Sequence, residues 1–166
     1  MARGACGTGV FKCTDSPFEG AGGDTKPASC VKLEDAMRYC ETLGARLPSE
    51  AEWEDFAGNG RGDTYPWGSA SPSALPERLC WSGRVKRDEP CEVGSFPAGA
   101  SEGGIHDLSG NVIEWTSTRE GTMAITKGGH FRFAGSNLVQ VRFRAPVPVV
   151  SRFASIGFRC VSAPRP

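Results

Sequence analysis

Seven cysteines spread along the chain constrain its fold more than any other feature of the sequence, because cross-links decide which distant segments lie together. They stand at positions 6, 13, 30, 40, 80, 91 and 160, and none forms a CxxC pair. A zinc ribbon or a thioredoxin-like redox site is therefore not expected. The wide spacing favours disulfide bonds and an extracytoplasmic location, whether secreted, periplasmic or at the cell surface. Unpaired buried thiols in a cytosolic protein are the alternative.

The remaining composition is typical of one loop-rich domain. The chain contains 22 glycines and 12 prolines distributed throughout its length, which predicts short strands and few helices. Nineteen basic residues balance nineteen acidic residues. With no net charge to attract nucleic acid or an anionic membrane, we expect no nucleic-acid partner. No apolar run is long enough to cross a bilayer, so no membrane span is expected.

Two helices are predicted, close together in the first third of the chain. Residues 33–43 carry apolar side chains at the spacing of one buried helical face: Leu33, Ala36, Met37, Cys40 and Leu43. Gly44 ends this helix. Ser49 begins the second helix, because Glu52 three residues later completes a capping box. Its predicted buried face consists of Trp53, Phe56 and Ala57, and it ends at Gly58.

The rest of the chain reads as loops and short strands. We interpret residues 1–26 as an N-terminal extension and residues 27–166 as the domain. No helix is expected over residues 59–104, where Cys80 and Cys91 enclose a charged segment that is typical of a solvated loop. The alternation of polar and apolar residues and the turn signals predict four strands, at residues 112–117, 124–127, 139–145 and 157–161.

Four segments in order give the chain a resemblance to a known family. They are residues 36–54, residues 65–68, residues 93–97 followed by 106–116, and residues 127–129 followed by 157–160. At these spacings the set resembles the formylglycine-generating enzyme, or sulfatase-modifying factor, family from about residue 27 to residue 161. The resemblance implies an α+β, C-type-lectin-like fold of the sulfatase-modifying factor type. That fold has two helices, small twisted antiparallel sheets and much irregular loop.

The resemblance also implies where catalytic residues would lie. Family enzymes carry two cysteines after the Gly-Gly motif, which bind copper(I) as thiolates and oxidise a substrate cysteine to formylglycine. Here Phe133 stands at the first position and Leu138 lies near the second, and no cysteine occurs between Cys91 and Cys160. We therefore predict no copper site and no catalytic residues of the family kind, as in a pseudoenzyme. An enzyme of altered chemistry that uses His130 or His106 is the alternative.

A structural calcium site is a further implication of the resemblance. Carried over to this chain, Asp107 and Glu114 supply carboxylate oxygens, while Gly110 and Val112 supply backbone carbonyls. Hard oxygen ligands of this kind suit calcium. The alternative is that Asp107 and Asn111 make turn hydrogen bonds while Glu114 pairs with an arginine.

The cysteine pairing rests partly on the resemblance and partly on proximity. Cys40 and Cys160 match a pair that is bridged in the family. Cys80 and Cys91 are predicted partners because they are close in sequence. Cys13 with Cys30 is the next prediction, which leaves Cys6 spare, although Cys6 in place of Cys13 stays open.

We expect the chain to act as a non-catalytic binding or assembly module. Its candidate surface follows Gly129 and mixes aromatic and arginine side chains of the kind enriched at interfaces: His130, Phe131, Arg132, Phe133, Asn137, Arg142 and Arg144. The expected partner is another protein chain, which would bind these loops or supply strands to a sheet edge. A glycan is the other candidate, although the Glu-Pro-Asn motif of sugar-binding lectins is absent.

Overall fold

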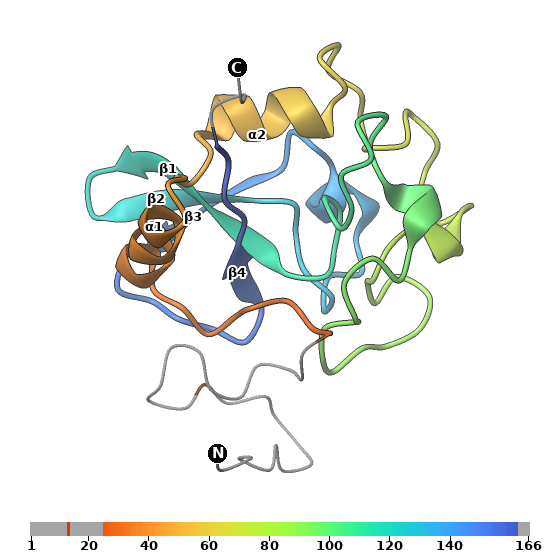
Figure 1. Cartoon of the computed structure of the whole chain (residues 1–166). Coiled ribbons are helices and arrows are strands. Elements are labelled where there is room, and N and C mark those ends of the chain that lie inside the picture. Colours follow the sequence, from red (N-terminus) through yellow and green to blue (C-terminus); the bar gives the residue numbers. More distant parts are fainter. Residues whose placement is uncertain (1–12, 14–24, 163–166) are drawn as a thin grey trace.

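One four-stranded sheet and two helices form the frame of the molecule, shown in the computed structural model (Figure 1), which describes Cys13 and residues 25–162. The helices are α1 (Leu33–Thr42) and α2 (Glu50–Ala57), and the strands are β1 (Ile113–Glu120), β2 (Met123–Lys127), β3 (Arg144–Pro148) and β4 (Ile156–Phe158). Three short 3-10 helices lie in the loops: η1 (Pro76–Arg78), η2 (Pro97–Gly99) and η3 (Ser136–Val139).

Both predicted helices are confirmed, and local chemistry explains their ends. The hydroxyl of Ser49 accepts from the backbone N–H of Glu52 at 3.2 Å, and the carboxylate of Glu52 accepts from the N–H of Ser49 at 2.8 Å. This is the predicted capping box. Gly44 has a φ of +65° just after α1, a left-handed conformation that favours glycine. Leu43 was predicted to be buried but is 61% exposed, because the helix has already ended at Thr42.

The sheet differs from the prediction of several small antiparallel sheets. Its order is β3-β2-β1-β4, and β1 pairs with β4 in parallel while the other two pairs are antiparallel. The predicted strand at residues 139–145 is wrong over most of its length, since η3 ends at Val139 and β3 begins only at Arg144. The carbonyl of buried Val139 accepts from the hydroxyl of Ser109 at 2.7 Å, outside the sheet.

Trp115 organises the core between α1 and the sheet. This fully buried side chain packs with Leu33, Cys40 and Ile156, and its indole N–H donates to the carbonyl of Val31 at 3.0 Å. Two further apolar clusters surround Trp53 and Trp81. Large aromatic side chains thus supply the buried apolar area in a chain with little regular structure.

Both edges of the sheet are poorly suited to an added strand. On β3, Pro146 and Pro148 have no N–H to donate to a neighbour. On β4, Gly157 already pairs with Ser29, and a Cβ at Gly157 would lie 2.6 Å from the carbonyl oxygen of Ala28. This geometry weighs against strand addition as the way in which a partner binds.

Three disulfides connect distant parts of the described chain, in the pairs that were predicted. Cys40 joins Cys160, Cys80 joins Cys91, and Cys13 joins Cys30. Cys6 lies outside the described residues. The three bonds indicate an oxidising, extracytoplasmic environment. Among the described helices, none is long and apolar enough to span a membrane.

Candidate functional site

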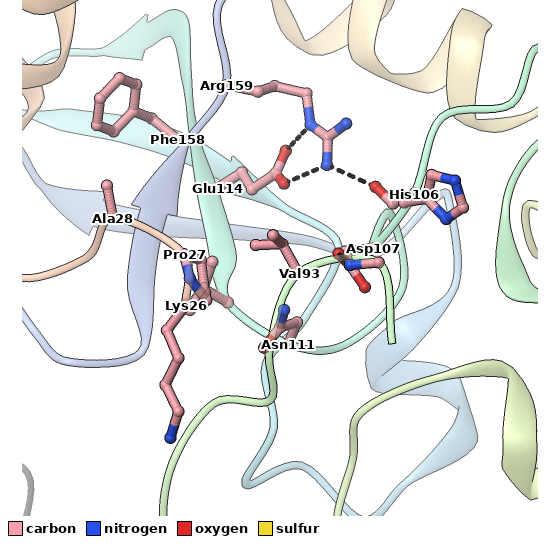
Figure 2. Close-up of a pocket in the computed structure, with 12 residues that line it drawn as sticks. Lys26, Pro27, Ala28, Val93, His106, Asp107, Asn111, Glu114, Phe158 and Arg159 are labelled. Atoms are coloured by element: carbon pink, nitrogen blue, oxygen red, sulfur yellow. Dashed lines mark hydrogen bonds and ion pairs between the residues drawn. The ribbon is translucent and has the colours of Figure 1, made fainter. Parts of the chain in front are cut away.

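A pocket of about 530 Å³ opens where the start of β1 meets the end of β4 (Figure 2). Its walls come from segments that are far apart in sequence, and they combine charged with apolar side chains. The lining residues are Lys26, Pro27, Ala28, Val93, Gly94, His106, Asp107, Asn111, Val112, Glu114, Phe158 and Arg159. Three of the four residues of the predicted calcium site, Asp107, Val112 and Glu114, therefore line this pocket.

Glu114 forms the charged centre of this pocket. Arg159 donates to both of its carboxylate oxygens at 2.6 Å, and the indole N–H of Trp53 donates to it at 2.8 Å. Arg159 also donates to the backbone carbonyl of His106 at 3.0 Å, as Figure 2 shows. Burial alone would lower the pKa of Arg159, but the adjacent carboxylates of Glu114 and Asp107 raise it. The guanidinium therefore stays charged and balances Glu114.

Asp107 and Asn111 occupy left-handed turns beside this pair, with φ of +59° at each. Asp107 accepts from the N–H of Gly94 at 2.7 Å, and burial raises the pKa of its carboxyl. Asn111 is 1% exposed and accepts from the N–H of Cys91 at 3.0 Å, while its Nδ2 has no partner in the described structure. Both side chains thus bond to the backbone of residues 91–94, which is distant in sequence, and connect their turns to that segment.

The pairing of Glu114 with an arginine matches the alternative to calcium, whereas Asp107 and Asn111 bond to residues 94 and 91 rather than within their own turns. Glu114 already accepts three hydrogen bonds and its charge is balanced by Arg159, so a calcium ion would compete with the guanidinium. Asp107 fits a cation better, because its partly buried carboxylate accepts only one hydrogen bond from the described residues. Within the described part of the chain, no three His, Cys, Asp or Glu side chains gather as a metal-binding group. Calcium stays a prediction.

The segment after Gly129 forms a second candidate site, on the loops beyond β2. Gly129 has a φ of +69°, and a Cβ there would lie 2.2 Å from the carbonyl oxygen of Leu138. Glycine is therefore required at this point, because the backbone is left-handed and the carbonyl of Leu138 leaves no room for a side chain. Phe131 is fully buried, so this residue of the predicted surface belongs to the core instead.

His130 and Phe133 pack against each other at this loop. Their ring centroids are 3.8 Å apart, and Phe133 also contacts the edge of Phe143 at 5.7 Å. Phe133 therefore fills, with an aromatic ring, the position where the family resemblance places the first catalytic cysteine. Burial, together with the charge of Arg132, lowers the pKa of His130 to about 4. The imidazole is neutral at physiological pH.

The other predicted surface residues divide into two groups. Arg132, Asn137 and Arg142 are exposed on the loops after Gly129. Arg144 lies at the start of β3 and pairs with Glu50 of α2 at 2.7 Å and with Glu120 of β1 at 2.8 Å. Arg144 therefore fastens α2 to the sheet rather than extending the loop surface.

The loop between Cys80 and Cys91 lies against the segment after Gly129, a contact that the sequence did not predict. Ser82 donates from its N–H to the carbonyl of Phe133 and from its hydroxyl to the carbonyl of Phe131, both at 2.9 Å. Arg132 donates to the carbonyl of Asp88 at 3.3 Å. A serine in a charged loop carries no sequence signal for such contacts, so only the structure reveals this joint surface.

Comparison with known proteins adds sequence and fold relationships. A family model for the sulfatase-modifying factor enzyme 1-like domain matches residues 9–164. The inactive C-alpha-formylglycine-generating enzyme 2 of Bos taurus is 32% identical over 154 residues, which cover 82% of this chain and 50% of that protein. The hercynine oxygenase of Mycolicibacterium thermoresistibile is 41% identical over 97 residues, which cover 56% of this chain and 21% of that protein.

The chain thus spans between about a fifth and a half of the length of these relatives. The structure of PvdO from Pseudomonas aeruginosa superposes with a TM-score of 0.67 over 82% of this chain and 61% of that chain, at 21% sequence identity. At this identity the likeness speaks for the fold alone, and it confirms the predicted α+β architecture.

Proposed function

The chain belongs to the sulfatase-modifying factor, or formylglycine-generating enzyme, family, and we propose that it is a non-catalytic member that binds another protein through the loops after Gly129. The observation that carries this proposal is the state of the thiols. All six described cysteines form disulfides, and Phe133 packs on His130 where a catalytic cysteine is expected. Without a pair of free thiolates, copper(I) has no soft ligands at this position.

The relatives support a scaffold without the family chemistry. A protein that carries the word inactive in its name shares 32% identity over 82% of this chain. The composition of the surface supports binding, because Arg132, Asn137 and Arg142 are exposed around a half-buried ring, Phe133. Arginine and aromatic side chains are enriched at protein interfaces. The sheet edges, with Pro146 and Pro148 on one side, leave the loops as the better surface.

The loss of chemistry and the binding role are tested separately. Incubation with copper and a cysteine-containing sulfatase peptide is expected to produce no mass change in the peptide. Conversion of the peptide cysteine to formylglycine would overturn the proposal. For binding, the protein is purified gently from its native source, and co-purifying chains are identified by mass spectrometry at stoichiometric amounts.

A pair of matched variants then assigns the surface. Asn137→Arg with Arg142→Glu changes the loops after Gly129, whereas Thr42→Arg with Arg38→Glu makes the same charge changes on the exposed face of α1. We expect the loop variant to lose the partner and the α1 variant to retain it. Retention by both variants would place the interface elsewhere, and a chain that purifies alone would contradict a stable partner.

An enzyme of altered chemistry is the second candidate, because hercynine oxygenase is 41% identical over 97 residues. In the loop, the neutral imidazole of His130 is a chemically competent ligand or base. Metal analysis of the purified protein distinguishes the two functions. A stoichiometric transition metal that is lost in a His130→Ala variant would favour an enzyme, whereas calcium alone or no metal favours the binding module.

At the edge of the pocket in Figure 2, where Asp107 and Val112 line its wall, we propose a structural calcium ion bound by Asp107 with the carbonyls of Gly110 and Val112. The partly buried, singly hydrogen-bonded carboxylate of Asp107 supports this proposal, and the pairing of Glu114 with Arg159 limits the expected affinity. Thermal unfolding in calcium and in chelator is the test. We expect calcium to raise the unfolding temperature of the native chain but not that of the Asp107→Asn variant. Equal increases in both proteins would exclude this site.

A further inference from the structure

The loop closed by Cys80 and Cys91 projects two cationic side chains, Arg84 and Lys86, and Arg132 of the proposed binding loops contacts the same loop at Asp88. All three side chains are exposed. From this arrangement we infer that the partner docks an acidic segment, rich in Asp and Glu, on these three cations. The inference rests on the proposed function and names the chemistry of its partner.

Covalent and hydrogen-bonded contacts hold this surface in place before any partner binds. The disulfide closes the loop, and the N–H of Arg87 donates to the hydroxyl of Ser82 at 2.8 Å. Ser82 in turn donates to the carbonyls of Phe131 and Phe133. The ring of Trp81 packs over Gly83, where a Cβ would lie 2.3 Å from it. A surface that is ordered in advance loses little conformational entropy on binding.

The acids of the same loop are engaged by neighbouring lysines. Asp88 pairs with Lys86 at 3.4 Å, and Glu89 pairs with Lys26 at 2.8 Å. Among the described residues, no carboxylate forms an ion pair with Arg84 or Arg132. The ion pair of Lys86 with Asp88 is exposed and therefore weak, so Lys86 readily exchanges Asp88 for a carboxylate of a partner. The surface is therefore positive although the chain has no net charge.

An exposed apolar side chain between two of the cations in sequence indicates a polypeptide rather than a nucleic acid. Val85 lies between Arg84 and Lys86 in sequence and is 66% exposed. A polypeptide can present an apolar residue between its acidic residues, and an exposed valine is then covered on binding. Affinity for nucleic acid comes mainly from the neutralisation of many phosphates, and three cations on a chain without net charge are too few for this.

The test measures binding of a fluorescein-labelled peptide of about twelve residues with Asp and Glu on both sides of one leucine. Fluorescence anisotropy gives the Kd at low salt for the native chain, Arg84→Glu with Arg132→Glu, and the control Arg38→Glu with Arg119→Glu, two exposed arginines outside the proposed surface. We expect the double loop variant to weaken binding by about tenfold or more, and the control by about twofold or less. Replacing every acid of the peptide by its amide is expected to abolish binding.

Three outcomes overturn the inference. They are no binding of the acidic peptide at about 1 mM, an equal loss in the loop and control variants, and tighter binding of duplex DNA than of the peptide at the same salt. Failure here is distinguishable from failure of the proposed function. If the native partner is lost by Asn137→Arg with Arg142→Glu but kept by Arg84→Glu with Arg132→Glu, the binding module stands and only its acidic partner is wrong.

Discussion

Arg159 holds both carboxylate oxygens of Glu114, with Nε at 2.6 Å from Oε2 and Nη2 at 2.6 Å from Oε1. The pair connects the segment after β4 to β1, and the indole of Trp53 extends it to α2. Glu114 is 4% exposed, so its charge depends on this arginine for compensation. Removing one partner of such a pair lowers the free energy of unfolding strongly, because the other charge is left buried without compensation.

We predict that Arg159→Met destabilises the fold by about 3–5 kcal/mol. Equilibrium unfolding in urea measures the change, and Arg38→Met provides the control. Arg38 pairs with Glu34 on the exposed face of α1, where loss of an ion pair costs about 1 kcal/mol or less. Adding Glu114→Gln to Arg159→Met is expected to recover part of the loss. Equal losses of unfolding free energy in Arg159→Met and Arg38→Met would show that the buried pair stabilises the fold no more than an exposed one.

Gly129 and Gly44 separate the cost of backbone conformation from the cost of close packing. Their φ angles are similar, +69° and +65°, but a Cβ at Gly129 would lie 2.2 Å from the carbonyl oxygen of Leu138, whereas nothing lies within 4 Å at Gly44. We predict that Gly44→Ala costs about 1 kcal/mol, while Gly129→Ala costs about 3 kcal/mol or more because the loop must shift. Thermal unfolding of both variants tests this difference, and similar unfolding temperatures would contradict it.

Local signals in the sequence were sufficient for the helices, whereas the disulfide pairs followed from the family resemblance and from proximity in sequence. The capping box at Ser49 and the glycine after α1 act within a few residues of their own positions, so pattern reasoning finds them. The prediction failed where distant residues decide. Residues 139–145 alternate like a strand, but the chain there first completes η3, whose last carbonyl bonds to the hydroxyl of Ser109.

The candidate site shows the same limit. A resemblance brings Asp107 and Glu114 together, but it does not say that Arg159 occupies both oxygens of Glu114. Phe131 lies in a loop-like sequence but is fully buried. Its N–H donates to the carbonyl of buried Asn111, and this hydrogen bond holds the segment against the core. Contacts between loops leave no hydrophobic periodicity in the sequence, so pattern reasoning does not predict them.

The Cys40–Cys160 bond is expected to contribute most among the three disulfides to the free energy of unfolding. It closes a sequence separation of 120 residues, against 11 for Cys80–Cys91. The chain-entropy model gives about 5 kcal/mol for the long loop and about 3 kcal/mol for the short one. Unfolding of the paired alanine variants, Cys40→Ala with Cys160→Ala and Cys80→Ala with Cys91→Ala, measures both. A larger loss for the short loop would show that native contacts outweigh chain entropy here.

Acid is predicted to destabilise the native chain more than a His130→Gln variant. Burial lowers the pKa of His130 to about 4 in the folded protein, whereas an unfolded histidine titrates near 6.5. Between these values the unfolded state binds more protons, so the contribution of His130 to stability is complete above about pH 6.5 and is lost as the pH falls to about 4. The expected size is ~2 kcal/mol after allowance for partial solvent exposure. Unfolding free energies of both proteins at several pH values isolate this contribution, since the carboxylates are common to both. A difference that does not change with pH would mean that His130 is not neutralised by burial.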